Sequence, residues 1–242
     1  MPRDDGFNPL FALADWTAKT SRDWPTEAKE TARRALIDIV ACMIPGANEP
    51  VTRKCYDVVS HWGEGRSRTI GFEKALSSPL AALVNGTNAH ALDFDDNFDP
   101  AKAHATAVIV PALLALADER DMGTVDLIDA YIVGLQILGR VGQAVNPYHR
   151  NRGWHATATL GAIGAAAASA RLLRLNTDQT SHTISMSTSR AGGFMSQFGT
   201  DTKPLHAGFA ASGGVQSALF ASAGLSAGSD TLHGATGLRY LM

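Results

Sequence analysis

Residues 155–171 read His-Ala-Thr-Ala-Thr-Leu-Gly-Ala-Ile-Gly-Ala-Ala-Ala-Ala-Ser-Ala-Arg. Alanine is the strongest helix former, whereas each glycine inside a helix costs roughly 1 kcal/mol relative to alanine. Such a cost is usually offset when neighbouring helices pack closely against the glycine. The stretch therefore predicts a helix over 155–173 inside a crowded, all-α core.

Apolar residues at helical spacing predict further helices on both sides of this stretch. The predicted ranges are 8–19, 25–46, 51–62, 79–92, 104–119 with a break or kink at Pro111, 125–145, 178–190 and 204–222. Residues 68–72 are predicted to be a short strand or an extended edge, and 223–242 to be an irregular tail. Because we find no linker, low-complexity run or tandem repeat, we expect residues 1–242 to form a single domain.

The composition is that of a globular protein, with 45% hydrophobic and 18% charged residues among 242. The formal net charge of −2 gives no global attraction to nucleic acid or to an anionic membrane, so neither is an expected partner. Cys42 and Cys55 cannot supply the ligands of an all-cysteine iron–sulfur cluster. Residues 1–6 lack the pattern of a signal peptide, and 156–170 is short and weakly hydrophobic for a membrane span, so we expect a cytoplasmic protein.

Three basic residues stand at predicted helix starts: His104, His155 and Lys203, the last directly before Pro204. A helix N-terminus offers unpaired N–H groups and a partial positive charge, and a nearby Lys or His completes a site for anions. Each residue taken alone is more often a capping or surface group. Our hypothesis is that the three converge on a substrate with two or three carboxylates.

An acidic loop begins at Asp93 and continues to Asp99. It does not fit a calcium-binding EF-hand, because Phe98 stands where glycine is needed and His104 where a bidentate glutamate is needed. We therefore predict no metal ligand. Two interpretations stay open: a solvated acidic turn, or a carboxylate held near His104 that orients its imidazole. His90, one helical turn earlier, is interpreted as a core or supporting residue.

Three stretches resemble the MmgE/PrpD family: 85–96 (NGTNAHALDFDD), 155–171 and 200–211 (TDTKPLHAGFAA). With the opening helices, the resemblance covers nearly the whole chain. It implies a compact multi-helix domain. It also implies chemistry at a carbon next to a carboxylate, as in 2-methylcitrate dehydratases, cis-aconitate decarboxylases and iminodisuccinate epimerases. None of these needs an iron–sulfur cluster, so we expect no cofactor.

The resemblance also implies site residues. The predicted catalytic set is Asp93, His104, His155 and Lys203, and the predicted substrate-binding set is Asn97, Lys203 and His206. Lys203 and the helix N-termini would bind carboxylates, His104 or His155 would act as acid or base, and Asp93 would orient one of them. Asn97 departs from the threonine that is common in the decarboxylase branch, and the spacing from it to His104 is one residue longer.

Family members continue from a segment like 229–237 into an α/β lid domain, whereas this sequence ends at Met242 and has His233 where glutamate is usual. We therefore expect the lid to be absent. The leading hypothesis is a lyase acting on a small carboxylic acid. The alternatives are a truncated, non-catalytic remnant, one subunit of a split enzyme whose partner chain supplies the lid, or a helical interaction module. Exposed apolar faces lead us to expect a homodimer.

Overall fold

A computed structural model describes residues 7–242; segment 1–6, where we looked for a signal peptide, lies outside the described residues. The elements are α1 (Pro9–Lys19), α2 (Thr26–Gly46), α3 (Pro50–Val59), β1 (Glu64–Ser67), α4 (Ser78–His90), η1 (Asp99–Ala101), α5 (Thr106–Arg120), α6 (Thr124–Val145), α7 (Tyr148–Asn151), α8 (Ala156–Leu172), α9 (Thr177–Thr188), η2 (Met195–Gln197), α10 (Thr202–Ser222) and α11 (Leu238–Leu241). The predicted all-α class is confirmed, since the described residues contain one short strand and no sheet.

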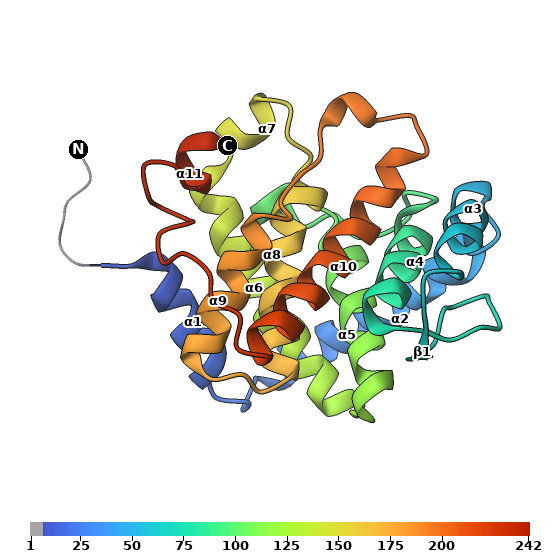
Figure 1. Cartoon of the computed structure of the whole chain (residues 1–242), viewed down its shortest axis with the longest axis horizontal. Coiled ribbons are helices and arrows are strands. Elements are labelled where there is room, and N and C mark those ends of the chain that lie inside the picture. Colours follow the sequence, from blue (N-terminus) through green and yellow to red (C-terminus); the bar gives the residue numbers. More distant parts are fainter. Residues whose placement is uncertain (1–6) are drawn as a thin grey trace.

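Helix α8 is the centre of the fold (Figure 1). Every residue of it except Arg171 is buried. It packs against α5, α6, α9 and α10, and a helix that is apolar all round is stable only in such an interior. A Cβ added at Gly164 would lie 2.8 Å from the Leu138 side chain, so this glycine lets α6 approach. The close packing predicted from the sequence is therefore present.

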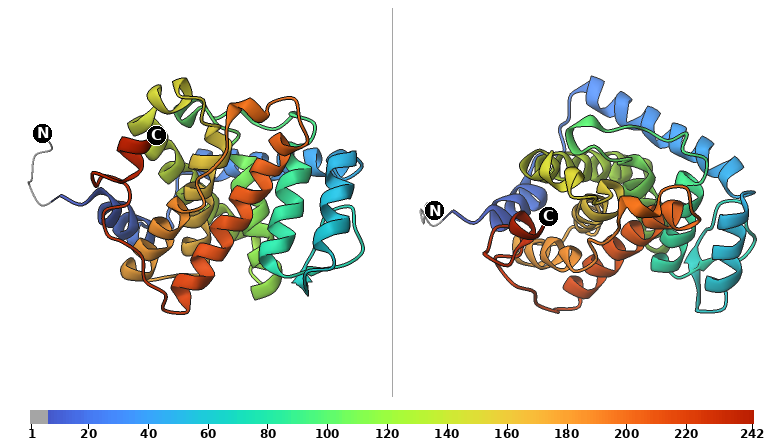
Figure 2. Two further views of the ribbon diagram at one scale, coloured as in Figure 1. Left: turned by 45° about the horizontal axis from the view of Figure 1, so that its top comes forward. Right: turned by 90° about the horizontal axis from the view of Figure 1, so that it is seen from above.

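Helices α4 and α10 lie side by side in the three views of Figures 1 and 2, and their backbones approach closely. A Cβ at Gly208 would lie 2.3 Å from the Leu83 carbonyl oxygen, and one at Gly86 would lie 2.8 Å from the Gly208 Cα. Only glycine fits at such an approach. The contact brings the C-terminal end of α4 beside the first turn of α10.

Of the two alternatives predicted for 68–72, a short strand or an extended edge, the strand is wrong, because β1 covers Glu64–Ser67 instead. Asparagine side chains of α4 form hydrogen bonds with the backbone of residues 68–70, which follow β1. The Ile70 N–H donates to Asn85 Oδ1 at 2.9 Å, and Asn88 Nδ2 donates to the Ile70 carbonyl at 2.9 Å. With these groups satisfied by amides, residues 68–70 need no neighbouring strand.

The predicted start of α5 at His104 is also wrong by two residues. The Thr106 N–H donates to Asp96 Oδ1 at 2.9 Å, while the His104 N–H donates to Thr157 Oγ1 at 3.0 Å. His104 thus belongs to the loop and is tied to the start of α8.

Smaller differences occur at other termini. Helix α3 ends at Val59 instead of Trp62, and the predicted irregular tail closes with the short α11. None of the described helices is both long and apolar enough to cross a bilayer.

Candidate functional site

A cavity of about 620 Å³ opens between the acidic loop and the starts of α8 and α10. It is lined by Asp93, Asn97, Phe98, Asp99, Lys102, Ala103, His104, Arg150, His155, Thr157, Phe198, Gly199 and Lys203. Five of the six residues predicted for the site line it, and the sixth, His206, lies behind His155. The convergence proposed from three separated stretches of sequence is therefore present in the fold.

The acidic loop is a closed, ordered turn. The Phe98 N–H donates to the Ala103 carbonyl at 2.8 Å, which joins the two sides of the loop around η1. Asp93 and Lys102 adopt left-handed conformations, with φ of 57° and 54°. This region is uncommon for residues other than glycine, although Asp tolerates it. The loop geometry points Asp93 toward the first turn of α10.

Lys203 lies in the first turn of α10, and its ammonium contacts the Asp93 carboxylate. The Nζ atom is also 5.8 Å from the centroid of the Phe198 ring. The Lys203 side chain is 16% exposed, whereas Asp93 is 56% exposed. The cation is thus sheltered on one side and reachable from the cavity.

His155 is the N-cap of α8 and is buried. Its backbone N–H donates to the Gly193 carbonyl at 3.0 Å, and its Nδ1 lies 2.9 Å from Nδ1 of His206. One of these two atoms must carry the hydrogen and the other must accept it. His206 therefore contacts the cavity through His155, although the sequence predicted it as a substrate-binding residue.

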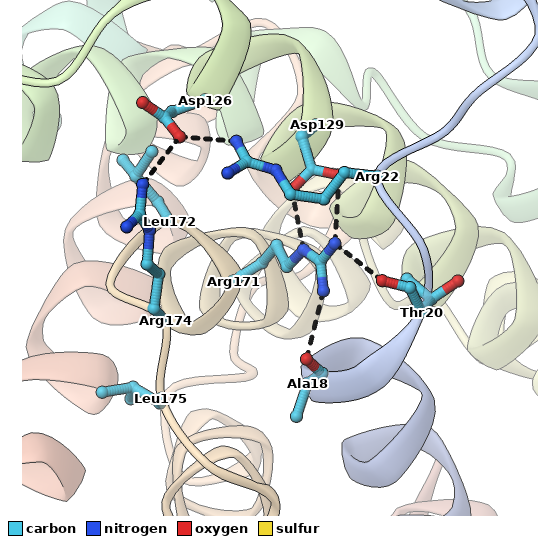
Figure 3. A pocket seen from close by; sticks show the side chains of 9 residues that line it. All are labelled: Ala18, Thr20, Arg22, Asp126, Asp129, Arg171, Leu172, Arg174 and Leu175. Carbon is cyan, nitrogen blue, oxygen red and sulfur yellow. Dashed lines mark hydrogen bonds and ion pairs between the residues drawn. The ribbon is translucent and has the colours of Figure 1, made fainter.

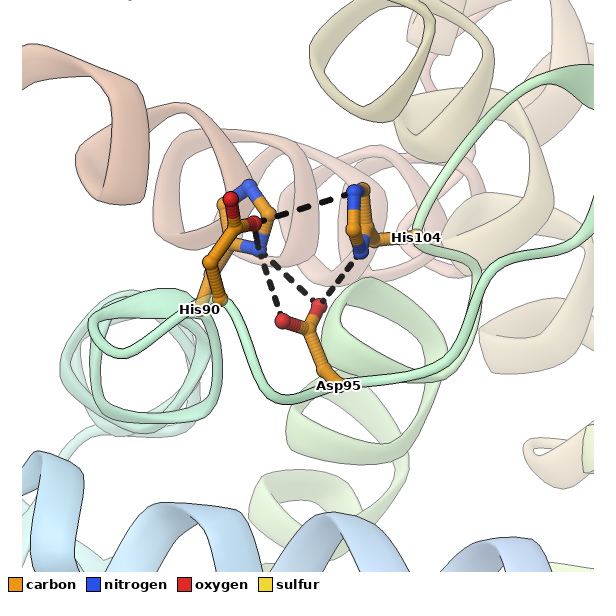
Figure 4. A group of neighbouring side chains, drawn as sticks. His90, Asp95 and His104 are labelled. Carbon is orange, nitrogen blue, oxygen red and sulfur yellow. Dashed lines mark hydrogen bonds and ion pairs between the residues drawn. The ribbon is translucent and has the colours of Figure 1, made fainter. Parts of the chain in front are cut away.

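His104 forms a second group with His90 and Asp95 (Figure 4). Its Nδ1 is 3.2 Å from Asp95 Oδ2, and its Nε2 is 3.8 Å from Asp93 Oδ1. The ring thus lies between the carboxylate predicted to orient it and a closer one that the prediction did not name.

The two cavity histidines differ in charge. Burial opposes a charge on His104, but the hydrogen bond and charge of Asp95, together with Asp93, outweigh burial and raise the pKa of His104. Burial, with neighbouring basic groups, lowers the pKa of His155 to about 3. The site therefore combines His104, whose surroundings favour the charged form, with His155, which is neutral near neutral pH. Environments that push pKa values apart are typical of acid and base pairs.

His90, Asp93, Asp95 and His104 each offer an atom of a type that binds metals, all within 4.8 Å of one another. In this arrangement, however, Lys203 contacts Asp93, and Asp95 accepts from His90. We assign these groups no metal, and the prediction that the site has no metal ligand stays a prediction.

Sequence reasoning missed Asp95. It lies two residues after Asp93 in the same acidic loop, and no feature of the sequence distinguishes the two aspartates. The structure separates them sharply, because the Asp95 side chain is fully buried and Asp93 faces solvent.

A second cavity, of about 300 Å³, lies near the end of α8 and contains several arginines (Figure 3). Arg171 donates to Asp129 at 2.7 Å and to the carbonyls of Thr17, Ala18 and Thr20 at 2.8–3.2 Å. Its donors are already used to join α1 to α6 and α8. We interpret this cavity as part of the packing and not as a ligand site.

The model of the MmgE/PrpD N-terminal domain matches residues 12–242. A cis-aconitate decarboxylase-like protein, oryM, of Aspergillus oryzae is 30% identical over 228 residues, covering 90% of this chain and 47% of that protein. The cis-aconitate decarboxylase of Aspergillus terreus is 31% identical over 224 residues, covering 89% and 46%. The human cis-aconitate decarboxylase is 29% identical over 203 residues, covering 81% and 42%. The chain thus spans about half the length of these relatives.

Proposed function

The chain belongs to the MmgE/PrpD family, and from this premise we propose that it acts as a lyase on a small di- or tricarboxylic acid. The relatives named above make cis-aconitate the first candidate substrate and decarboxylation the first candidate reaction. Dehydration of a 2-methylcitrate-like acid is the second. The observation that carries the proposal is the meeting of Lys203, His104 and His155 at one cavity.

Carboxylate binding is assigned to Lys203. An ammonium has three N–H donors, and the contact with Asp93 uses one of them. A substrate carboxylate can therefore approach the same cation from the cavity. Arg150, which also lines the cavity, adds positive charge for a second carboxylate, whereas the Lys102 ammonium is paired with Asp99.

Proton transfer is assigned to the histidines. When a carboxylate leaves as CO2, the electron pair of the broken C–C bond stays on the substrate carbon, which must then gain a proton. His104 is suited to donate it, because the nearby carboxylates raise its pKa and so favour its charged form. His155 is neutral and suited to hydrogen-bond the substrate or, in a dehydration, to accept a proton from carbon.

The cavity is open on the side of the acidic loop, where Asp93 and Asn97 are exposed. Desolvation strengthens electrostatic interactions at such sites. We propose that a further polypeptide segment, in a partner chain or elsewhere, covers this opening during turnover. Under this proposal the described residues bind the acid weakly by themselves and turnover requires the cover.

We also propose a homodimer in the cytoplasm. Trp62 and Val58 at the end of α3 and Phe209 on α10 are 66%, 54% and 52% exposed around one apolar groove. Apolar patches of this kind are commonly covered by a partner. Light scattering tests the assembly, and a monodisperse monomer at micromolar concentration contradicts it.

The test of the proposed function is a thermal-shift panel of cis-aconitate, citrate, 2-methylcitrate and succinate. Saturating ligand, at about 100 times Kd, is expected to stabilise the protein by about 2.7 kcal/mol, which is a rise of roughly 5–10 °C. NMR of each stabilising acid then tests for loss of CO2 or water, which the proposal expects only when the covering segment is also present.

Lys203→Met is expected to abolish the thermal shift. The matched control is Lys19→Met, because Lys19 also pairs with an aspartate, Asp15, but lies on α1 away from the cavity. If no acid shifts the wild-type protein, or if Lys203→Met retains the whole shift, the proposed function is wrong.

A further inference from the structure

Asp95 is a buried carboxylate that the mechanism above does not use. Its side chain is fully buried, and none of the described lysine or arginine side chains pairs with it. Instead both oxygens accept from His90 Nδ1, at 3.1 and 2.9 Å, and Oδ2 faces His104 Nδ1 at 3.2 Å (Figure 4). A buried carboxylate is costly unless hydrogen-bond donors surround it, so both histidines must present N–H groups to it.

We propose that Asp95, held by His90, is a positioning residue that fixes the proton of His104 on Nδ1 and leaves Nε2 as the proton-donating atom at the cavity. The inference rests on the proposed function, because it names the atom through which His104 would act. Asp95 itself does not line the cavity.

The hydrogen count supports one arrangement. Asp95 is acceptor-only when ionised, so each Nδ1 that faces it must be a donor. With Nδ1 of His104 protonated, only Nε2 gains or loses a proton, and that atom is on the side of Asp93. The buried Nε2 of His90 has no hydrogen-bond partner. With Nδ1 of His90 protonated, this Nε2 carries a lone pair, so no N–H group is left buried without an acceptor.

Packing among the histidine rings restricts movement of His90 and His104. The rings of His90 and His104 have centroids 4.7 Å apart, and the His155 ring lies 6.0 Å from that of His90. The backbone N–H of His104 is held by Thr157 Oγ1. His104 is therefore fixed through its main chain, and its Nδ1 lies 3.2 Å from Asp95 Oδ2.

Some of the charges around His104 raise its pKa and others lower it. Asp95, Asp93 and Asp96 are the acidic groups that face it, and Lys203, His155 and His90 are the basic ones. Burial acts to raise the pKa of Asp95, but hydrogen bonds from His104 and His90 outweigh it and hold that pKa well below its usual value. Asp95 is therefore ionised whenever His104 titrates, and the contact favours the charged imidazole.

The experiment is a pH titration of 15N-histidine-labelled protein by NMR, with the His104 signals assigned from their absence in His104→Gln. In the wild type, Nδ1 is expected to stay protonated while Nε2 titrates. In Asp95→Asn the midpoint of His104 is expected to fall by at least about one pH unit, which is a tenfold loss of proton affinity. Asp118→Asn is the control, since it removes a paired carboxylate far from the cavity.

An unchanged His104 midpoint in Asp95→Asn overturns the proposal. A wild-type His104 whose neutral form carries its proton on Nε2 also overturns it, and this measurement stands even if the variant does not fold. The titration needs no turnover. Loss of all carboxylate binding with the expected titration therefore contradicts the proposed function alone, whereas normal binding with an unshifted His104 contradicts the role of Asp95 alone.

Where turnover is measured, the pH profile gives a second readout. In Asp95→Asn, the part of the pH profile that reflects the titration of His104 is expected to shift to lower pH. The variant is also expected to lower kcat more than it changes KM, because Asp95 does not touch the substrate. Equal loss at every pH contradicts a positioning role.

Discussion

The Nδ1 atoms of His155 and His206 lie 2.9 Å apart in the interior of the protein. Two neutral imidazoles at this distance share one hydrogen, so the tautomer of one ring determines that of the other. His155 faces the cavity and His206 does not. Whether the other ring nitrogen of His155 donates or accepts a hydrogen bond at the cavity is therefore determined by the tautomer of a residue outside it.

Replacing His206 tests this coupling. His206→Ala leaves a buried imidazole nitrogen without a partner, and we expect a loss of about 1–3 kcal/mol in the free energy of unfolding. His206→Asn, whose amide reaches the position of Nδ1, is expected to lose less. Urea unfolding measures both, and equal stability of the two variants contradicts the importance of this hydrogen bond.

Acid should destabilise the fold well before its carboxylates titrate. Burial lowers the pKa of His155 to about 3 and that of His149 to about 4, from an ordinary value of 6.5. Below pH 6.5 the unfolded chain binds protons at these residues and the folded chain does not, so stability falls as pH falls. At pH 5 the loss is about 2 kcal/mol for each.

His104 acts in the opposite direction, because its raised pKa gives stability at low pH that is lost as pH rises through its folded value. The pKa of His206 is also lowered by burial, so three histidines with lowered pKa values oppose one with a raised pKa, and we expect a net loss of stability in acid. Urea unfolding at pH 7, 6 and 5 measures the combined effect of these histidines on the free energy of unfolding. His155→Gln should reduce the acid sensitivity, whereas the exposed His61→Gln should not. Stability that is flat between pH 7 and 5 contradicts the assignment.

Asp93 and a substrate carboxylate should compete for Lys203. Asn also tolerates the left-handed conformation, so Asp93→Asn removes the charge while keeping the loop geometry. We expect a few-fold tighter binding of carboxylic acids by calorimetry, with turnover reduced if Asp93 takes part in catalysis. A loss of affinity as large as that of Lys203→Met would mean that Asp93 holds Lys203 in place.

The contact between α4 and α10 should tolerate no side chain at Gly208. A Cβ there meets the Leu83 carbonyl at 2.3 Å, so Gly208→Ala must separate the helices, and we expect a loss of about 2 kcal/mol or more in the free energy of unfolding. Gly123→Ala is the control, because a Cβ there has no neighbour within 4 Å. Thermal denaturation of the two variants measures the difference, and equal melting temperatures contradict the interpretation.

The helices were predictable because their apolar spacing is local information. The Ala/Gly stretch of α8 and a start of α10 within two residues of Pro204 follow from residue type alone. Termini were less certain, since they depend on side chains far along the chain. The start of α5 is set by Asp96 and Thr157, which no local pattern connects to it.

The candidate site was predicted in composition but not in arrangement. Lys203 and His155 were predicted from helix starts and family resemblance, and His104 from the same resemblance and a helix start that lies two residues later in the structure. The burial of Asp95, and the place of His206 behind His155, depend on how α4, α8 and α10 meet in space. A sequence cannot distinguish the exposed Asp93 from the buried Asp95 two residues later, because an irregular loop has no fixed period.

Arg171 sets a limit on how the chain can be shortened for laboratory work. The family match begins at residue 12, inside α1, but the buried guanidinium needs the carbonyls of Thr17, Ala18 and Thr20 at the end of that helix. A version that begins after residue 20 would leave a charged group with unfilled donors in the interior and would express poorly. Tags and fusions should therefore be attached ahead of α1, leaving the whole helix intact.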